Sequence, residues 1–257
     1  MTAPDGATRW PFLDHPGPLA FAHRGGAGEW PENTMPAFEH ALALGYRYLE
    51  TDVHATADGV LVAFHDHHLD RVTDRGGPIG ALPWSEVRRA RVNGEPIPLL
   101  QDVLERWPDV RVNIDAKHDA AVEPLVAVLD RTDAHDRVCV AAFSDTRLAR
   151  FRRLTRGRVC TATGPREIAR LRVASYGVPT GELVGACVQV PVRHRRVRLV
   201  DPLFVAAAHR RGRQVHVWTI DAPGEMERLL DLGVDGLMTD RPVVLKEVLQ
   251  RRGQWTG

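Results

Sequence analysis

The chain has 257 residues, of which 44% are hydrophobic and 26% charged, and its formal net charge is +1. This composition is typical of a globular protein and excludes a disordered chain, and no stretch approaches the roughly 20 apolar residues that a membrane span needs. The balanced charge also gives no reason to expect a nucleic acid or a membrane surface as a partner.

Residues 1–18 are rich in proline, glycine and aspartate. They contain no apolar run that could serve as the core of a signal peptide. We therefore interpret residues 1–18 as an N-terminal extension and residues 19–250 as one domain, and we expect a soluble, cytoplasmic protein.

Each of the three cysteines, Cys139, Cys160 and Cys187, lies in an apolar run. This setting favours small buried core residues. Their spacing matches no zinc motif, and an odd count fits no disulfide framework.

Apolar runs typical of strands alternate with helical patterns along the chain. This alternation predicts a parallel sheet with helices outside it, and the length suits one (β/α)8 barrel of the TIM type. The predicted strands are Leu19–Ala22, Tyr48–Val53, Val60–Phe64, Val110–Ala116, Val138–Ala142, Arg158–Ala162, Ala186–Val190, Gln214–Ile220 and Asp235–Thr239. The predicted helices are Met35–Leu44, Leu100–Trp107, Ala121–Asp130, Thr146–Leu154, Pro202–Arg210 and Gly224–Leu232.

Nine predicted strands compete for eight barrel positions. Only six residues separate Val53 from Val60, whereas parallel neighbours need a crossover of a dozen or more. These six include Asp58-Gly59, a strong signal for a tight hairpin. We therefore predict that Val60–Phe64 returns antiparallel as a β-hairpin extension at the barrel mouth, and that the other eight strands form the barrel.

The connections around the first strands carry further signals. Asn33-Thr34 precedes the first helix as an N-cap, and Gly45 follows its last periodic residue. The segment Asp66–Gly94 is mostly polar and too long for an idle connection, so we expect it to form part of the substrate wall.

Two acidic side chains share one face of the second strand. Glu50 and Asp52 are two residues apart, so both point the same way near the end of that strand. Two carboxylates inside a barrel repel each other unless a cation lies between them. This pair indicates a hard-metal site for Mg²⁺ or Ca²⁺; the alternative is a solvated edge strand.

The next barrel strand ends in Asn113, Asp115 and Lys117, which also share one face. Asp115 offers a third oxygen ligand, and Lys117 offers a point charge for a phosphoryl oxygen. The alternative is a buried Asp–Lys pair along one strand.

Two histidines are expected at the same mouth. His23 closes the first strand beside Arg24, whose planar fork suits a phosphate, and the glycines that follow allow close backbone approach. His65 returns from the hairpin, whereas we interpret His67 and His68 as solvated loop residues. Phosphodiester cleavage needs one group that takes a proton and one that gives a proton, and two histidines meet that need.

In this order, the motifs resemble those of the glycerophosphodiester phosphodiesterase family. Each motif alone is weak, but the ordered set is specific, and it spans residues 19–245. The motifs are His23-Arg24-Gly25, Pro31-Glu32-Asn33-Thr34, Glu50-Thr51-Asp52-Val53, Asp58-Gly59, His65-Asp66, Asn113-Ile114-Asp115-Ala116-Lys117, Val217-Trp218-Thr219, Gly233-Val234-Asp235-Gly236 and Thr239-Asp240-Arg241-Pro242.

The resemblance implies a TIM barrel that hydrolyses glycerophosphodiesters to glycerol 3-phosphate and an alcohol. It implies one divalent cation, Mg²⁺ or Ca²⁺, and an apolar wall for the alcohol, although the wall residue could instead be a core aromatic. The implied roles are His23 and His65 as the acid–base pair, Glu50, Asp52 and Asp115 as metal ligands, Arg24 and Lys117 on the phosphate, Trp218 as the wall, and Glu32 and Asn33 as supporting residues.

Several alternatives stay open. The family commonly carries Glu where this chain has Asp115, so the identity and coordination of the metal are undecided. The nucleophile is either water or a neighbouring glycerol hydroxyl, and either histidine could be the acid. A lysophospholipase D would share every catalytic residue, and a barrel that only binds ligands is the alternative from another class.

A basic loop, Pro191–Val200, follows the sixth barrel strand and is expected on the active-site face. Two interpretations are open: a solvated loop, or a docking patch for anionic lipid headgroups with apolar neighbours touching acyl chains. Trp30 could extend the same rim. The four arginines of this loop are Arg193, Arg195, Arg196 and Arg198.

Overall fold

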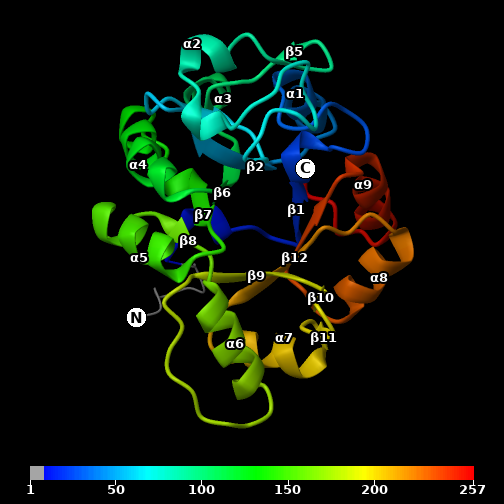
Figure 1. Ribbon diagram of the computed structural model, residues 1–257. Helices are drawn as coiled ribbons and strands as arrows, with labels where there is room; N and C mark the ends of the chain where they lie inside the picture. Colours follow the sequence, from blue (N-terminus) through cyan, green and yellow to red (C-terminus); the bar gives the residue numbers. More distant parts are fainter. Residues whose placement is uncertain (1–8) are drawn as a thin grey trace.

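The computed structural model describes residues 9–257, so the first eight residues of the predicted extension lie outside it. Eight parallel strands follow one another around a barrel in the order β1, β2, β6, β7, β8, β9, β12 and β13 (Figure 1). β8 and β9 close the ring through two backbone hydrogen bonds, from Ala186 to Thr161 at 2.7 Å and from Thr163 to Cys187 at 2.8 Å. The predicted (β/α)8 barrel is therefore confirmed.

The barrel strands agree with eight of the nine predicted strands, and no strand begins or ends more than two residues from its predicted bound. The shortest is β8, whose pairing is limited to two residues. The bounds are β1 (Leu19–Ala22), β2 (Tyr48–Ala55), β6 (Arg111–Ala116), β7 (Val138–Ala141), β8 (Cys160–Thr161), β9 (Cys187–Pro191), β12 (Gln214–Trp218) and β13 (Gly236–Thr239).

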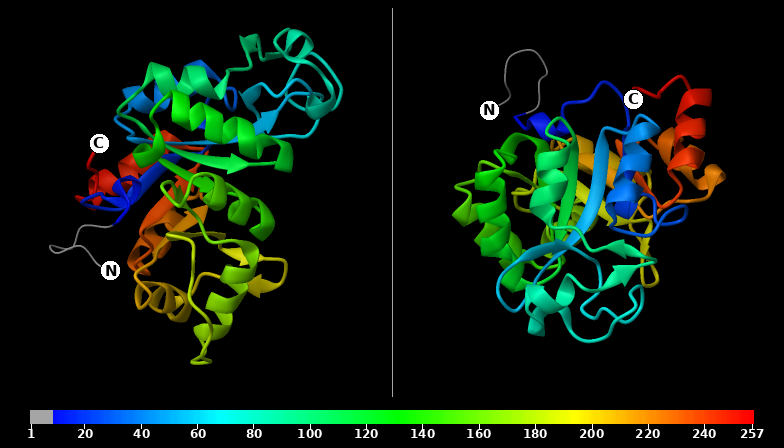
Figure 2. Two further views of the ribbon diagram at one scale, coloured as in Figure 1. Left: turned by 90° about the vertical axis from the view of Figure 1, so that its left-hand side faces the viewer. Right: turned by 90° about the horizontal axis from the view of Figure 1, so that it is seen from above.

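Helices cover the outside of the barrel (Figures 1 and 2). Six of these helices were predicted, whereas α2, α6 and α9 were not. α6 carries three arginines that obscure its apolar stripe, and α2 has only four residues. None of the described helices has the length and apolar character needed to cross a membrane. The bounds are α1 (Met35–Ala43), α2 (Trp84–Val87), α3 (Leu100–Arg106), α4 (Val122–Arg131), α5 (Asp145–Leu154), α6 (Pro165–Ala174), α7 (Pro202–His209), α8 (Pro223–Asp231) and α9 (Pro242–Arg251).

The ninth predicted strand is β3 (Leu61–Ala63), and it pairs antiparallel with the end of β2, as predicted from the short connection. The segment Asp66–Gly94, called the excursion below, follows β3 and contains α2 and β4 (Arg91–Val92). β4 pairs antiparallel with β5 (Glu95–Pro96), which comes directly after the excursion. Together, β3 and the excursion bury a hydrophobic cluster separate from the barrel core: Val62, Phe64, Leu69, Ile79, Val87, Ala90, Val92 and Ile97.

The described part of the N-terminal extension closes the end of the barrel opposite the active site. Residues Pro11–Leu13 form a 3₁₀ turn in which Phe12 packs edge-on against Tyr48 of β2 at 5.4 Å between ring centres. The Tyr48 hydroxyl donates to the Phe12 carbonyl at 2.9 Å. His15 lies 3.0 Å from the Thr256 hydroxyl, so the segment that precedes β1 lies beside the C-terminal residues.

Candidate active site

A cavity of about 440 Å³ opens at the carboxyl ends of the barrel strands. Parallel strands bring their ends to one face of a barrel, so residues far apart in the sequence meet there. Eight of the ten site residues predicted from the sequence line this cavity: His23, Arg24, Glu50, Asp52, His65, Asp115, Lys117 and Trp218.

The turn after β1 presents His23 and Arg24 to the cavity. Arg24 has a positive φ of 52°, and a Cβ atom on the following Gly25 would lie 2.8 Å from the Cβ of Ala37. Only glycine fits this close approach to α1. The tight turn also directs the Arg24 amide toward Glu50, to which it donates at 3.1 Å.

The three carboxylates come from two paired strands, and all are buried. In the β2–β6 register Asp52 lies opposite Asp115, while Glu50 lies one step below on the same face as Asp52. Because the exposed fractions are 4% for Glu50 and 1% for Asp52, the alternative of a solvated edge strand is wrong. The Nζ atom of Lys117 is 2.7 Å from both Asp52 and Asp115. The buried Asp–Lys pair is therefore present, and its lysine still lines the cavity.

These buried charges shift one another's pKa values. Burial first, and then the nearby charge of Asp52, raise the pKa of Glu50 to about 7. Burial also raises the pKa of Asp115. Burial alone would raise the pKa of Asp52, but the positive charges of Lys117 and Arg24 outweigh burial and lower this pKa. Three buried carboxylates therefore share two cations, Lys117 and Arg24, and an additional cation beside them would lower the pKa values of Glu50 and Asp115.

Glu32 and Asn33 contact two of the cavity residues from outside the cavity. Glu32 accepts from Arg24 at 3.1 Å, and Arg24 also lies 3.2 Å from Asp52. Asn33 donates to Asp52 at 3.4 Å and accepts from Thr51 at 2.7 Å. These contacts fix the orientations of Arg24 and Asp52.

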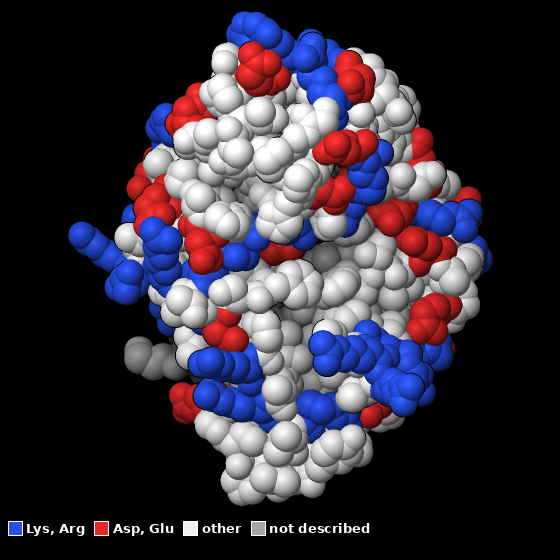
Figure 3. Space-filling model, in the orientation of Figure 1, with Lys and Arg blue, Asp and Glu red and all other residues white. Residues whose placement is uncertain are grey.

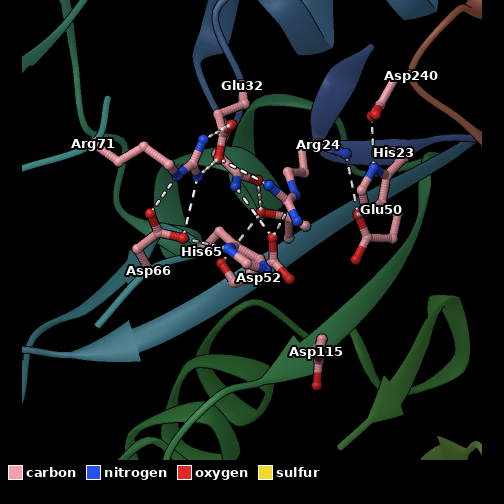
Figure 4. Close-up of polar contacts among 12 residues, drawn as sticks. His23, Arg24, Glu32, Glu50, Asp52, His65, Asp66, Arg71, Asp115 and Asp240 are labelled. Atoms are coloured by element: carbon pink, nitrogen blue, oxygen red, sulfur yellow. Dashed lines mark hydrogen bonds and ion pairs between the residues drawn. The ribbon is translucent and has the colours of Figure 1, made fainter. Parts of the chain in front are cut away.

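Both cavity histidines are held by a carboxylate at the same ring nitrogen. Nδ1 of His23 lies 2.6 Å from Asp240, and Nδ1 of His65 lies 2.5 Å from Asp66 (Figure 4). Each Nε2 atom is thereby left for chemistry at the cavity, and the Nε2 of His23 lies 3.8 Å from Glu50. Burial acts to lower the pKa of His23, but Glu50 and Asp240 outweigh it, so the pKa is raised.

Sequence reasoning did not assign these orienting carboxylates. Asp240 and Asp66 stand within motifs noted in the sequence, but nothing there indicated that each meets a histidine. Arg71 was missed entirely; it bonds both Asp66 and Glu32 and so links the His65 turn to the Arg24 turn. His67 and His68 are exposed, as predicted.

The other side of the cavity is apolar. It includes Phe143, Ile168, Leu199 and Trp218. Trp218 packs edge-on against Phe143 at 5.7 Å between ring centres, and it both lines the cavity and packs against the barrel core. The Asp66–Gly94 excursion does not line this cavity; its residues line an adjacent groove of about 840 Å³.

The basic loop forms a hairpin of β10 (Arg193–His194) and β11 (Val197–Arg198), and Figure 3 shows basic side chains gathered there. All four arginines are exposed, and His194 reaches the cavity, so the loop lies on the active-site face as predicted. Val200 is buried and cannot meet acyl chains, whereas Leu199 faces the cavity and Trp30 lines the adjacent groove instead.

A parallel barrel whose mouth joins two oriented histidines, three buried carboxylates, an arginine and a lysine defines an enzyme of the phosphoric diester hydrolase class. Residues 23–244 match the model of the "Glycerophosphoryl diester phosphodiesterase family". The chain belongs to this family.

Similar proteins agree with this assignment. A protein of Mycobacterium tuberculosis named "Probable glycerophosphodiester phosphodiesterase 2" is 43% identical over 98% of both chains. The crystal structure of a putative glycerophosphoryl diester phosphodiesterase from Silicibacter pomeroyi covers 96% of this chain and all of its own, at a TM-score of 0.82 and 24% identity. The structure of an Oleispira antarctica phosphodiesterase in complex with the product sn-glycerol-3-phosphate covers 91% of this chain and 97% of its own. Its TM-score is 0.78 and its sequence identity is 22%. The two structures share the fold.

Proposed function

We propose that this chain hydrolyses glycerophosphodiesters to glycerol 3-phosphate and an alcohol, using one divalent cation, Mg²⁺ or Ca²⁺, held by Glu50, Asp52 and Asp115. The observation that carries the proposal is the meeting of two carboxylate-held histidines with these three carboxylates in one cavity. The names of the similar proteins, and the product in the Oleispira structure, support the same substrate class.

The donor set suits a hard cation. Oδ1 of Asp115 is buried and has no hydrogen-bond partner among the described residues, and a buried oxygen of this kind is costly unless a cation or donor satisfies it. The ligand atoms of the three carboxylates do not all lie within 4.8 Å of one another in the described chain, where Lys117 bridges two of them. Binding therefore requires the carboxylates to draw together and Lys117 to turn toward the substrate.

The cation, when bound, would act as a Lewis acid on a phosphoryl oxygen. Arg24 and Lys117 would hold the remaining phosphoryl oxygens, and both start from ion pairs with Asp52 that place them at the cavity wall. Once Lys117 has turned and the cation is bound, these positive charges stabilise the charge that develops in the transition state.

The two histidines would divide the proton transfers between them. One Nε2 removes the proton from the nucleophile, which is water or the neighbouring glycerol hydroxyl, and the other delivers a proton to the departing alkoxide. Asp240 and Asp66 keep the Nδ1 proton on each ring and so define which nitrogen faces the cavity.

The test is turnover of glycerophosphocholine and glycerophosphoethanolamine by the full chain, before and after exhaustive chelation. We expect chelation to abolish turnover and Mg²⁺, Ca²⁺ or Mn²⁺ to restore it. Full turnover by the chelated protein would refute the requirement for a cation. If neither substrate is turned over with any of the three metals, the proposed substrate class is wrong.

A second candidate is lysophospholipase D activity, favoured by the apolar wall that Phe143, Ile168 and Leu199 add to the cavity. Its lysophospholipid substrate would carry an acyl chain against this wall. We further propose that the arginine hairpin contacts anionic lipid, with each arginine contributing about 1 kcal/mol near an anionic leaflet.

The comparison of lysophosphatidylcholine with glycerophosphocholine separates the two activities, in wild type and with four arginines changed to glutamine. We expect the variant to lose lysophosphatidylcholine turnover and salt-sensitive binding to anionic vesicles. If the variant keeps its turnover of both substrates and wild type does not bind anionic vesicles at low salt, the lipid proposal is wrong and water-soluble glycerophosphodiesters remain the proposed substrates. The four positions are Arg193, Arg195, Arg196 and Arg198.

We also propose a cytoplasmic location. All three cysteines are free thiols, which suits a reducing compartment.

A further inference from the structure

All three cysteines of the chain meet at one point in the barrel interior. Cys139, Cys160 and Cys187 come from the consecutive strands β7, β8 and β9 and are at most 1% exposed. Their sulfur atoms all lie within 4.8 Å of one another, and the Cys139 and Cys187 sulfurs are 3.8 Å apart. Among residues 9–257, no other three His, Cys, Asp or Glu side chains bring their ligand atoms this close together.

The cysteines lie one layer below the floor of the active-site cavity. Ala141, Ala162 and Gln189 line that cavity, and each follows a cysteine by two positions on its strand. Residues i and i+2 of a strand share a face. The sulfur atoms are therefore separated from the cavity by two alanines and one glutamine.

The spacing of the sulfurs suits metal coordination. A tetrahedral ion with metal–sulfur bonds of about 2.3 Å holds its sulfur ligands about 3.8 Å apart. The Cys139–Cys187 distance already has this value, and the third sulfur needs only a small movement.

A fourth donor stands beside the cluster. His216 of β12 is completely buried and lies near the Cys187 side chain. Its Nε2 atom lies 3.1 Å from Oε1 of Gln214. A histidine that donates one N–H to an amide oxygen can offer its other nitrogen to a metal, as metal-binding histidines commonly do. Here Nδ1 lies 3.4 Å from Nε2 of Gln189, so the ring would have to leave this amide and move toward the sulfurs to complete the site.

We propose that Cys139, Cys160 and Cys187 form a site for one thiophilic d¹⁰ metal ion, Zn²⁺ or Cu⁺, with His216 as the fourth ligand for Zn²⁺. Each thiol releases its proton to solvent as its sulfur–metal bond forms. Soft thiolate ligands select these ions, whereas the carboxylates above select hard cations, so the two sites do not compete. The ion would enter during folding or through the alanine floor.

The test uses the full chain in excess Mg²⁺, loaded anaerobically with Co²⁺ as a reporter for Zn²⁺, or with Cu⁺. Because the chain has three cysteines in all, any thiolate-to-metal charge-transfer absorption must come from this cluster. We expect such a band, and native mass spectrometry should find one soft ion per chain. Tetrahedral Co²⁺ absorption would indicate Zn²⁺, and binding of Cu⁺ alone would indicate a trigonal sulfur site.

Cys160→Ala should abolish the band. Cys160→Val is a second variant that fills the space if alanine leaves a cavity, and for both a cooperative thermal unfolding transition checks the fold. If wild type shows no charge-transfer band and no soft-ion mass, even when refolded with either ion, the cysteines are packing residues only and the proposal is wrong.

Discussion

Replacing Asp240 with asparagine would isolate the contribution of the carboxylate that orients His23. The side chains of His23 and Asp240 are 14% and 29% exposed, and the atoms that join them are 2.6 Å apart. A hydrogen bond to a charged partner contributes about 1.5–3 kcal/mol. The partial exposure of Asp240 favours the lower part of this range. At 1.36 kcal/mol per factor of ten, we expect kcat to fall about 10- to 30-fold.

The assay is the pH profile of kcat and KM for glycerophosphocholine, with KM expected near wild type. Asp240 raises the pKa of His23, so its neutralisation lowers that pKa. If His23 acts in its protonated form, activity is lost as pH rises through this pKa, and the alkaline limb moves to lower pH. If His23 acts as the neutral base, activity is lost as pH falls through it, and the acidic limb moves to lower pH.

The matched control is Asp130→Asn, which removes the same kind of contact between His135 and Asp130, 2.9 Å apart on the surface. It should leave both limbs and kcat unchanged. An Asp240→Asn enzyme with wild-type kcat and an unmoved profile would refute the orienting role of Asp240.

Three further predictions concern other side chains. His65→Ala should lose about 10²–10⁴-fold in kcat while the exposed His67→Ala stays near wild type; equal activity of the two would refute the assignment. Asp115→Glu should keep activity within about tenfold if the bound cation is Ca²⁺, which accepts flexible oxygen geometry; complete loss with an intact fold would show that the site needs the shorter side chain. Burial lowers the pKa of His54 from 6.5 to about 4, so the unfolded chain binds a proton in that range that the folded chain excludes. Urea unfolding should therefore show up to about 3 kcal/mol of stability lost as pH falls through this window, and a smaller loss in His54→Asn.

The barrel could be predicted because its signals are local. The six residues before Val60 are too few for a crossover, and this alone separated β3 from the barrel strands. The sixth helix, α6, was not predicted because two of its buried residues, Glu167 and Arg172, are charged and obscure the periodic spacing of its apolar residues.

The convergence of the polar cavity residues also followed from local patterns, since each stands at the end of a predicted strand. Their partners could not be predicted in the same way. Asp240 lies 217 positions from His23 in the chain, and Arg71 meets Glu32 only through the course of the excursion. The cysteines were correctly predicted as buried, but their meeting depends on the register of β7, β8 and β9.

The separate hydrophobic cluster under β3 and the excursion has a consequence for how this enzyme could change. A segment that packs largely on its own apolar residues can be altered without unpacking the strands that carry the catalytic groups. Arg71 is the point where the segment reaches the active site, through Glu32 and Asp66. Replacement of the excursion by another sequence that keeps its small core, Asp66 and this arginine should therefore reshape the groove beside the mouth while leaving hydrolysis intact. The excursion and the barrel can therefore be changed independently of each other, in evolution and in design.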